Sequence, residues 1–383
     1  MRRIVVVGSG IGALEAAKEL EKHLEGRQRI DLSFVVQSNH FVYRPLLPHV
    51  VSGSLDTPSL SIPFRDLVAG ETNLVVDRPS RIDIDNRQVV CDQHRLPFDY
   101  LVYSPEAVVD WGDCDTCRQF AQPLHTVGDA ADLRQAVRAR DELAATYLVI
   151  GAGPSGVELA CQLQYALDAT SDDDRRVVLL ERSEQLLPDV PESVRLACRD
   201  HLETAGVEFK SECAVRSCGP DGVELADESL VEATCSVWCG GRRMPDLARR
   251  SDLPTDDLGR VRVDETLRAV DAPGVYAVGE AVSPSMSSSQ ADVVASQGKT
   301  AAKNVVADLS GRAPHEWARE GTKWLISLGP GEAVVYHNGA VISGAAGWSL
   351  YQFAHLSLIP GAAKKFGLAG AWLKEGLRSR EKM

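Results

Sequence analysis

The chain has 383 residues, enough for two or three domains, and its 44% hydrophobic and 25% charged residues exclude large-scale disorder. Its net charge of −13 argues against a nucleic-acid partner, because such a partner requires a basic protein face. The apolar run at 4–7 is only four residues long and leads into glycines, so it predicts a buried strand rather than a signal peptide.

Residues 4–13 have the pattern of a dinucleotide-binding turn. A β-branched strand leads into Gly8, Gly10 and Ala13, which match the spacing GxGxx(G/A). The first glycine makes the turn, the second lets the backbone approach a pyrophosphate, and the third position lets the helix pack on the strand. A helix is predicted over 14–24, and its first free N–H groups would meet the phosphates.

The nine cysteines are scattered along the chain, and their odd number favours a reducing compartment. Cys114 and Cys117 form the only CxxC pair. A zinc site would require a second such pair or paired histidines, so no metal site is predicted. Two free thiols in a loop are the favoured interpretation.

A second copy of the glycine turn follows 143 residues after the first. Gly151, Gly153 and Gly156 come after a β-branched strand that begins at 147, and a helix is predicted over 157–167. One such turn is a weak signal, but two copies in the same strand–helix context predict two nucleotide sites.

The strand after each turn ends at the position that contacts the nucleotide ribose. The predicted strand 176–180 ends at Glu181, whose carboxylate accepts from a ribose 2′-OH and repels a 2′-phosphate. This residue predicts a preference for NADH over NADPH, which Arg182 beside it opposes. In the first copy the strand 32–36 ends at Gln37, an amide that can hydrogen-bond but has no charge.

The second half of the chain adds further strands of this fold. A strand at 234–237 runs into Gly240, and a strand that begins at 274 leads to Gly279 and Glu280, which present a backbone N–H and a carboxylate. The pattern predicts an α/β fold of two Rossmann-like doubly wound domains, one inserted in the other, plus a C-terminal α+β module. The remaining predicted elements are a helix at about 289–309 and strands at 324–327, 333–336 and 340–342. The expected segments are 1–110 and 263–315 for the first domain, 111–262 for the inserted domain, and 316–383 for the module.

The region 360–383 predicts a helix that lies on a surface. Six basic residues there oppose two acids, and apolar residues recur at helical spacing with an aromatic ring beside them. This pattern suits a membrane interface, with the ring at headgroup depth and lysines towards anionic lipid. The alternative is a helix docked on the protein's own acidic body or in a homodimer interface. The apolar residues are Phe366, Ala369, Leu373 and Leu377, with Trp372 adjacent.

These motifs resemble the two-dinucleotide-binding-domain flavoproteins. The two glycine turns, the sequence GVYAVGEA at 274–281 and QGKTAAKN at 297–304 carry the resemblance. Within that superfamily, HFVYRPLLP at 40–48, GAGPSGVELA at 151–160 and the ending at 348–355 are similar to type II NADH dehydrogenases. The resemblance covers nearly the whole chain.

The resemblance implies non-covalent FAD in the first domain, NADH in the inserted domain, and electron transfer through the flavin to a quinone. It implies a cytoplasmic protein, peripheral on the inner face of the cell membrane. Glu158 would lie near the nicotinamide, the alternative being a helix acid stabilised only by the dipole, and Gln297 belongs to the quinone-site motif. The FAD-binding residues implied are Gly8, Gly10, Gly12, Ala13, Gln37, Arg44, Pro45, Ser104, Gly279 and Glu280; those for NADH are Gly151, Gly153, Gly156, Glu181 and Gly240.

Several positions depart from the family pattern. Gln37 and Glu280 stand where the family has an acid and an aspartate, and Glu106 replaces the glycine of a small turn. A carboxylate at Glu106 adds bulk and like charge beside a pyrophosphate. FAD binding is still expected, because the turn itself is intact. In the quinone motif Ala295 and Gln297 match, while two other positions do not.

Two other functions stay open beside NADH:quinone reduction. One is a soluble NAD(P)H-dependent flavin reductase with a different acceptor, and the other is a degenerate flavoprotein that acts as a subunit or regulator. Thiol chemistry at the flavin is disfavoured, because the first cysteine is Cys91 and none follows Cys239. A yellow purified protein would exclude the degenerate interpretation.

Overall fold

The computed structural model contains two compact units. Unit 1 consists of Met1–Tyr43, Ser61–Val108 and Arg242–Glu320, and unit 2 of Arg44–Leu60, Val109–Gly241 and Gly321–Met383. The segment expected as a C-terminal module therefore belongs to the same unit as most of the inserted segment. The structure describes residues 1–24, 30–139, 145–168, 175–251, 253–283, 286, 290–319 and 321–380.

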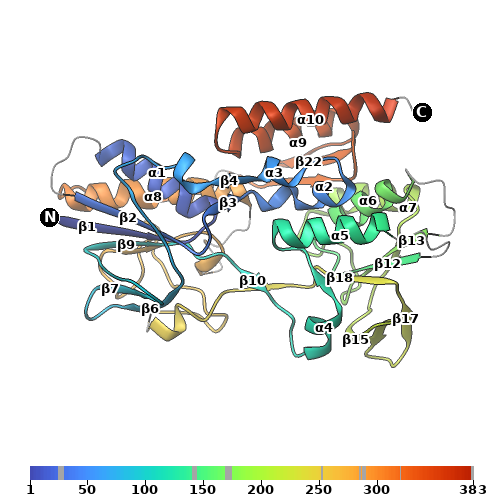
Figure 1. Ribbon diagram of the computed structural model, residues 1–383, viewed down its shortest axis with the longest axis horizontal. Helices are drawn as coiled ribbons and strands as arrows, with labels where there is room; N and C mark the ends of the chain where they lie inside the picture. The colour runs from blue at the N-terminus through green and yellow to red at the C-terminus, as the bar shows by residue number, and fades with distance from the viewer. Residues whose placement is uncertain are drawn as a thin grey trace. The chain divides into compact units, whose positions relative to one another are not determined.

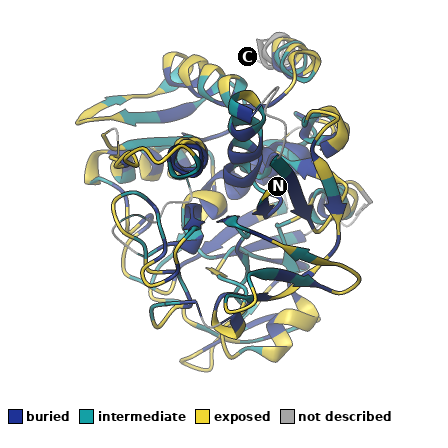
Figure 2. Cartoon of the chain, turned by 90° about the vertical axis from the view of Figure 1, so that its left-hand side faces the viewer, coloured by how far each residue is buried: buried dark blue, intermediate teal, exposed yellow. Residues whose placement is uncertain are grey.

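Unit 1 is built on a parallel sheet in the order β20–β9–β1–β2–β5. Its strands β1, β2 and β9 are labelled in Figure 1. Its central strands are buried (Figure 2). Ile4 and Val6 of β1, for example, are 0% exposed. Continuous apolar runs of this kind are typical of parallel sheets that are covered on both faces. A small antiparallel sheet, β6–β7–β8, shares one hydrophobic core with it. The strands are β1 (Arg2–Val7), β2 (Ile30–Val36), β5 (Asn73–Val76), β6 (Pro79–Asp83), β7 (Gln88–Cys91), β8 (Arg95–Pro97), β9 (Tyr100–Tyr103) and β20 (Val275–Ala277).

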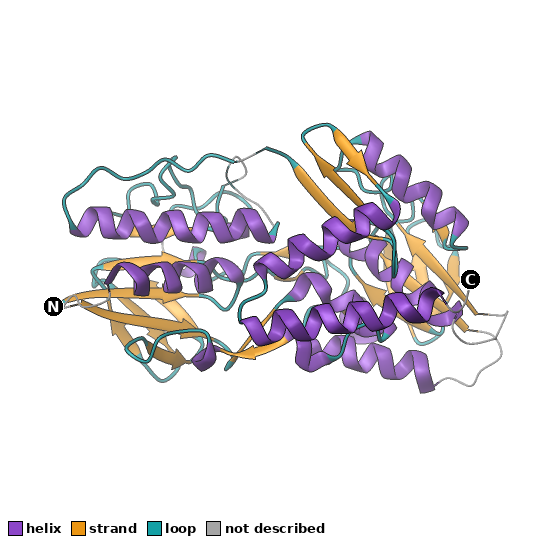
Figure 3. Ribbon diagram, turned by 90° about the horizontal axis from the view of Figure 1, so that it is seen from above, coloured by secondary structure: helices purple, strands orange, loops and turns teal. Residues whose placement is uncertain are grey.

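Two helices of unit 1, α1 (Ile11–Leu24) and α8 (Ala291–Leu309), lie side by side (Figures 1 and 3). They approach closely at two glycines: a Cβ on Gly298 would lie 2.2 Å from the carbonyl oxygen of Gly12. A Cβ on Gly12 would in turn lie 2.8 Å from the Ser104 hydroxyl. Gly298 is therefore required by the backbone at the start of α1, while Gly12 is confined by neighbouring side chains.

Unit 2 contains a second parallel sheet in the order β11–β18–β12–β13–β14. The register pairs Ala145 with Arg175 and Tyr147 with Cys235, so β12 lies between β13 and β18. An antiparallel sheet, β15–β16–β17, packs its apolar side chains into the same core. The elements are α5 (Val127–Ala139), α6 (Pro154–Asp168), α7 (Glu192–Thr204), β11 (Gln122–Pro123), β12 (Ala145–Ile150), β13 (Arg175–Leu180), β14 (Glu208–Lys210), β15 (Val215–Gly219), β16 (Gly222–Leu225), β17 (Leu230–Glu232) and β18 (Cys235–Trp238).

The last part of unit 2 is an antiparallel sheet, β21–β22–β23, followed by helices α9 and α10. Helix α9 lies against β22 so closely that a Cβ on Gly347 would be 2.3 Å from the Ala333 carbonyl oxygen. Within the described residues, no helix is both long enough and apolar enough to cross a bilayer. The elements are β21 (Lys323–Ser327), β22 (Ala333–His337), β23 (Ala340–Ile342), α9 (Gly344–Leu358) and α10 (Ala362–Arg380).

The predicted placement of Trp372 at a membrane surface is wrong. Trp372 is 3% exposed and meets Trp348 of α9 edge to face, with ring centroids 6.0 Å apart. Helix α10 docks through Leu368 and Trp372, one turn apart, because these two residues share one helix face. Phe366 and Leu373 of the predicted apolar stripe are exposed, and the Leu377 side chain lies outside the described residues.

The interpretation of Cys114 and Cys117 as two free thiols is also wrong. They form a disulfide with a Cα–Cα distance of 5.3 Å. The reason is local: Cys114 caps the short helix α4 (Asp115–Phe120) and Cys117 lies in its first turn, which brings the two Cα atoms within bridging distance.

The predicted fold class is confirmed: both units contain a parallel α/β sheet with a helix directly after each glycine turn. Helices α1 and α6 begin three residues earlier than predicted, at Ile11 and Pro154, because the turn leads straight into the first helical turn. Ser289, the expected start of the later helix, lies outside the described residues. The other short elements are β3 (His40–Val42), η1 (Arg44–Leu46), α2 (Leu47–Ser52), α3 (Thr57–Leu60), β4 (Ser61–Pro63), η2 (Phe64–Asp66), β10 (Val108–Val109), β19 (Arg242–Arg243), η3 (Arg249–Ser251) and η4 (Gly279–Ala281).

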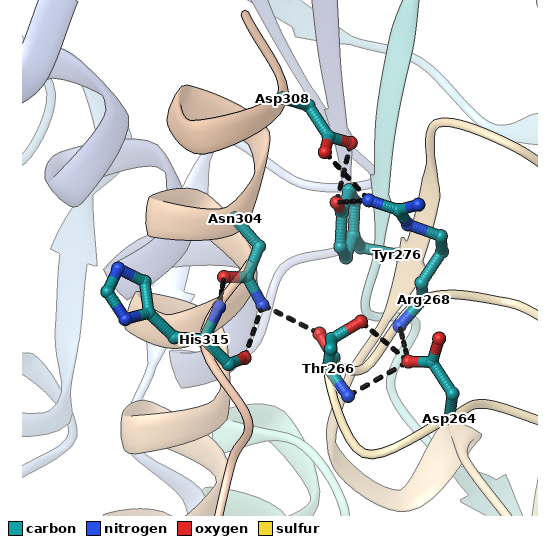
Figure 4. A network of polar contacts seen from close by, with 7 residues as sticks. All are labelled: Asp264, Thr266, Arg268, Tyr276, Asn304, Asp308 and His315. Carbon is teal, nitrogen blue, oxygen red and sulfur yellow. Dashed lines mark hydrogen bonds and ion pairs between the residues drawn. The ribbon is translucent and has the colours of Figure 1, made fainter. Parts of the chain in front are cut away.

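Polar side chains of α8 hold the loop before β20 in place (Figure 4). Asn304 is fully buried; its Nδ2 donates to the Thr266 carbonyl at 2.8 Å and to the His315 carbonyl at 2.9 Å, and its Oδ1 accepts the His315 N–H at 2.7 Å. One turn further, Asp308 accepts from Tyr276 at 2.7 Å and pairs with Arg268, also at 2.7 Å. The loop is thereby tied to α8 at two levels.

Replacing Asn304 with alanine is expected to destabilise unit 1 by about 2–4 kcal/mol, because two carbonyls and one N–H lose their buried partner together. Chemical denaturation followed by circular dichroism measures the loss. Lys303→Ala, an exposed neighbour on the same helix, is the control and should change stability by no more than about 0.5 kcal/mol. Equal stability of the two variants would contradict the assigned role of Asn304.

Candidate dinucleotide sites

The first candidate site lies where the strands of the unit 1 sheet end. Gly8 directly follows β1 and has a φ of 136°, a conformation that favours glycine. A Cβ at this position would lie 1.9 Å from the carbonyl oxygen of Ser104, which follows the neighbouring strand β9. The turn therefore requires glycine, and it brings Gly8 close to the Ser104 backbone.

Gln37 follows β2 at the same edge of the sheet. Its backbone N–H donates to the Ser9 hydroxyl at 3.1 Å, so the residue is fixed beside the glycine turn. Gln37 is exposed, whereas Ser9 is 9% exposed. The Gln37 side chain thus lies at the surface of this edge, where a ribose would be in reach.

Glu106 lies over the middle of the first turn. A Cβ built on Gly10 would be 3.4 Å from the Cγ and from the Oε1 of Glu106. The side chain that departs from the family pattern therefore lies at the glycine over which a pyrophosphate is expected. Its carboxylate is the main local feature opposed to an anionic ligand in this turn.

Gln297 of α8 positions Gly279 rather than facing open space. Its Oε1 accepts the Gly279 N–H at 2.7 Å, its Nε2 donates to the Met286 carbonyl at 2.6 Å, and the residue is fully buried. Glu280 beside it forms an ion pair with Arg242 at 3.0 Å. The quinone role of Gln297 stays a prediction.

Arg44 and Pro45 lie in η1 and belong to unit 2. Both are partly exposed, and Pro45 precedes the buried Leu46 and Leu47. Their expected contact with FAD stays a prediction.

The second candidate site lies at the carboxyl edge of the unit 2 sheet. Gly151 follows β12 with a φ of 102°, and a Cβ there would lie 2.7 Å from the Cα of Gly240, which follows β18. A Cβ on Gly156 would lie 1.9 Å from the Gly151 carbonyl oxygen. Gly151, Gly156 and Gly240 are thus brought together by close backbone contact.

Gly153 differs from these glycines, because a Cβ at this position would meet no protein atom within 4 Å. The space beside it is therefore open, as a turn that receives a pyrophosphate requires. Glu181 lies at the same turn: its Oε2 accepts the Ala152 N–H at 2.8 Å, and its Oε1 accepts the Ser183 N–H at 3.0 Å. A carboxylate has about four acceptor positions, so Glu181 can still accept from a ribose hydroxyl.

Glu158 of α6 is buried in a polar cluster rather than exposed as a simple helix acid. Its Oε1 accepts the Ser327 N–H at 2.9 Å and the Tyr351 hydroxyl at 3.4 Å. Burial raises the pKa of Glu158 to about 8, and these two hydrogen bonds only partly oppose the shift. Glu158 is therefore neutral at pH 7.

His49 of α2 extends this cluster. Gln162 Nε2 lies 3.1 Å from Nδ1 of His49, and the Tyr351 hydroxyl lies 3.2 Å from its Nε2. Because an amide NH₂ only donates, Nδ1 accepts and Nε2 carries the proton, which it donates to Tyr351. Burial, with His355 as a second cause, lowers the pKa of His49 to about 3 and so keeps the ring neutral. The cluster is a chain of neutral donors and acceptors that ends at Glu158.

Glu158→Gln is expected to remove a pH dependence of stability. The raised pKa means that the native protein binds one proton more than the unfolded chain between the ordinary value of 4.5 and about 8. The stability of the parent therefore falls as pH rises through this window, by roughly 2 kcal/mol from pH 6 to pH 8. Glutamine keeps the acceptor oxygen but does not titrate. Denaturation midpoints of both proteins from pH 6 to pH 9 check this, and parallel curves would show that Glu158 is ionised in the native state.

A surface cavity of about 320 Å³ in unit 1 lies at the other end of the sheet. Arg2 and Tyr100 in its wall are the first residues of β1 and β9, which places it at the amino ends of the strands. Dinucleotides bind at the carboxyl ends, so this cavity is separate from the candidate site. Its wall is formed by Arg2, Arg87, Asp99, Tyr100, Arg268, Pro273, Gly274 and Asp308.

Comparison with known proteins agrees with this geometry. Residues 2–298 match the family described as pyridine nucleotide-disulphide oxidoreductase. The type II NADH:quinone oxidoreductase Ndh of Mycobacterium tuberculosis is 27% identical, over 99% of this chain and 89% of that protein. The demethylphylloquinone reductase NdbB of Synechocystis sp. is 25% identical, over 98% and 96%. The structure of NDH2 from Plasmodium falciparum in complex with NADH aligns with a TM-score of 0.82 and 13% identity, over 99% and 98%.

Two parallel-sheet units, each with a glycine turn at its carboxyl edge, define an oxidoreductase with two dinucleotide-binding domains. The chain belongs to the pyridine nucleotide-disulphide oxidoreductase family. The predicted resemblance to type II NADH dehydrogenases is confirmed by relatives of that name.

Some residues of the two sites are not apparent from the sequence. Gly298 allows α8 to approach α1 closely. In the sequence, only its position within the QGKTAAKN motif indicates that this glycine is required. Ser327, Tyr351 and His49 surround Glu158 but come from three distant segments. Of the three, only Tyr351 lies in a segment, 348–355, that carries the resemblance.

Proposed function

We propose that this protein is an FAD-dependent oxidoreductase that takes hydride from NADH and passes electrons to a quinone. The observation that carries the proposal is the second glycine turn, where Gly153 borders open space beside the Glu181 carboxylate. The relatives named as NADH:quinone oxidoreductases, one of which matches 99% of the chain, supply the class of acceptor.

FAD binds at the turn of unit 1 in this proposal. Gly8, Gly10, Gly12 and Ala13 hold the pyrophosphate, and Gly279 approaches the ribityl and phosphate groups. Positive φ values of 136° at Gly8 and 81° at Gly279 support close backbone approach. Gln297 acts as a positioning residue, since it fixes the Gly279 N–H. A bound flavin accepts hydride from a nicotinamide and releases electrons to a second acceptor.

NADH binds at the turn of unit 2. Glu181 accepts from the ribose 2′-OH and repels the additional phosphate of NADPH. Glu158 is the proposed catalytic residue, because it keeps a proton on a buried carboxyl at pH 7, and reduction of a quinone consumes protons. Tyr351 and His49 orient this carboxyl.

The test has three measurements on the purified protein. Denaturation should release flavin in a 1:1 ratio, and NADH should reduce the bound flavin roughly tenfold to a thousandfold more efficiently than NADPH does. A water-soluble quinone should then sustain NADH oxidation. Protein that releases no flavin and is not stabilised by added FAD would be the degenerate flavoprotein. Flavin reduction without quinone turnover would instead favour the soluble reductase.

A membrane surface is the proposed place of the reaction, with helices α9 and α10 in contact with lipid. Phe353, Phe366 and Leu373 are between 71% and 79% exposed, although these are large apolar side chains. Helix α9 has no charged residue, and Lys364 and Lys365 begin α10. Exposed apolar groups beside lysines suit an interface with anionic lipid.

Flotation with vesicles of phosphatidylcholine and phosphatidylglycerol tests this location. The parent should float at low salt, and the double variant Phe366→Ser with Leu373→Ser should stay in the soluble fraction. Leu258→Ser, which replaces an apolar side chain of unit 1 that is 66% exposed, is the matched control and should float. If the parent stays soluble but sediments as a dimer that the double variant lacks, the face is a homodimer interface instead.

A further inference from the structure

Cys114 and Cys117 are joined by a disulfide in unit 2, while Cys91, Cys161, Cys198, Cys213 and Cys218 remain free thiols. The bridge closes a loop of only four residues, which removes little freedom from the unfolded chain and so stabilises the fold weakly. A single short bridge among many free thiols is typical of a redox-active pair rather than a structural crosslink.

The two sulfur atoms have different surroundings. Cys117 is 0% exposed, whereas Cys114 is partly exposed. The Cys117 N–H donates to the Sγ of Cys114 at 3.1 Å, and the Thr116 hydroxyl lies 3.5 Å from the same sulfur. Thr116 Oγ1 accepts the Cys218 N–H at 3.2 Å, so its own proton is free to point at Cys114. Both donors stabilise a thiolate at Cys114 and none of these contacts does so at Cys117.

The pair is connected to the second glycine turn through two tryptophans. The Cys114 N–H donates to the Trp111 carbonyl at 3.3 Å, and the Trp111 ring packs against Trp238 with centroids 5.5 Å apart. Trp238 Nε1 donates to the Asp110 carbonyl at 2.7 Å. Trp238 leads directly to Gly240, which lies against Gly151. A change at Cys114 therefore reaches the loop beside the candidate NADH site through packed groups.

We propose that Cys114–Cys117 is a thiol–disulfide exchange site for an external dithiol, and that its oxidised form binds NADH more tightly. A thiolate of the dithiol attacks the Sγ of Cys114 and the bond to Cys117 breaks, so that Cys117 leaves as a thiolate and takes up a proton. The second thiol of the reductant then attacks its own sulfur in the mixed disulfide and releases Cys114. In total two electrons and two protons pass from the dithiol to the pair.

Thiol mapping on the native protein tests the exchange. Dithiothreitol followed by alkylation of the native protein should label Cys114 without loss of the fold, whereas the buried Cys117 should be labelled only when the reduced sample is denatured. Oxidised glutathione, added before alkylation, should restore the bridge. In Cys117→Ser, the Cys114 thiolate should attack oxidised glutathione and form a mixed disulfide as one glutathione thiolate leaves, while in Cys114→Ser the buried Cys117 should form none. Cys218→Ser is the control and should exchange as the parent does. A bridge that opens only after denaturation, or adducts on both cysteines alike, would overturn the proposal.

The effect on NADH rests on the proposed function and has its own measurement. Calorimetric titration should give a Kd about threefold or more higher for the reduced protein, because the loop at Trp238–Gly240 is then less well ordered before binding. Trp111→Leu should keep the exchange but abolish the difference in Kd. Equal affinities of the two parent states would overturn the coupling. If neither state binds NADH, the proposed function and the coupling both fail, whereas thiol mapping alone decides the exchange site.

Discussion

Replacing Gly153 with valine should lower kcat/KM for NADH by on the order of a hundredfold or more while the protein stays folded and keeps its flavin. A Cβ at Gly153 meets no protein atom within 4 Å, so the new side chain does not strain the fold. It instead enters the space where the pyrophosphate of NADH must approach the backbone. Steady-state kinetics, flavin content and the thermal midpoint together measure the result.

Two matched variants make this experiment specific. Gly156→Ala places a Cβ 1.9 Å from the Gly151 carbonyl and should lower the thermal midpoint as well as activity. Gly367→Val is the control. It introduces the same side chain on α10, where a Cβ would also meet no protein atom within 4 Å, and it should leave the NADH kinetics unchanged. If Gly153→Val oxidises NADH like the parent, the second turn is not the NADH site.

Replacing Glu106 with glutamine should tighten FAD binding, on the order of a hundredfold, because a unit charge near a phosphate is worth roughly 3 kcal/mol at an effective dielectric constant of about 20. A Cβ built on Gly10 would lie 3.4 Å from the Glu106 carboxylate oxygen Oε1, so the charge of Glu106 opposes a pyrophosphate bound over this glycine. Glutamine keeps the shape and removes the charge. FAD titration of flavin-free protein, followed by fluorescence, gives both dissociation constants.

Glu71→Gln removes one negative charge from an exposed position of the same unit and is the control for net charge. Its FAD affinity should equal that of the parent. Weaker binding by Glu106→Gln would mean that the carboxylate contributes to the flavin site in this protein, which would make the departure from the family pattern a functional adaptation.

The sequence predicts those parts of the fold that depend on local pattern. The apolar runs and the glycine spacing are sufficient for β1, β12 and the helices that follow them, since each step from strand to turn to helix lies within about 20 residues. Gly8, Gly151 and Gly156 could be predicted for the same reason, because their backbone conformation belongs to the turn itself.

Residues whose surroundings come from distant segments could not be predicted. The burial of Glu158 could not be predicted from its place near the start of a helix, because Ser327 and Tyr351, which contact it, come from distant segments. Its raised pKa follows from this burial. The hydrogen bond from the Gly279 N–H to Gln297 could not be predicted either, because the two residues come from different elements. The disulfide was missed because spacing does not show that Cys114 caps a helix.

Unit 2 is assembled from three stretches of chain, and the last of them begins at Gly321. During synthesis the ribosome therefore releases the segments of unit 1 before it has made the final strands and helices of unit 2. Until then Glu158 on α6 has neither Ser327 nor Tyr351 as a hydrogen-bond partner, and the side of α6 that these segments later bury has no cover. Nascent chains of this protein should accordingly be clients of chaperones late in translation, and a stop codon shortly before residue 321 should yield a product that proteases remove rather than a functional half.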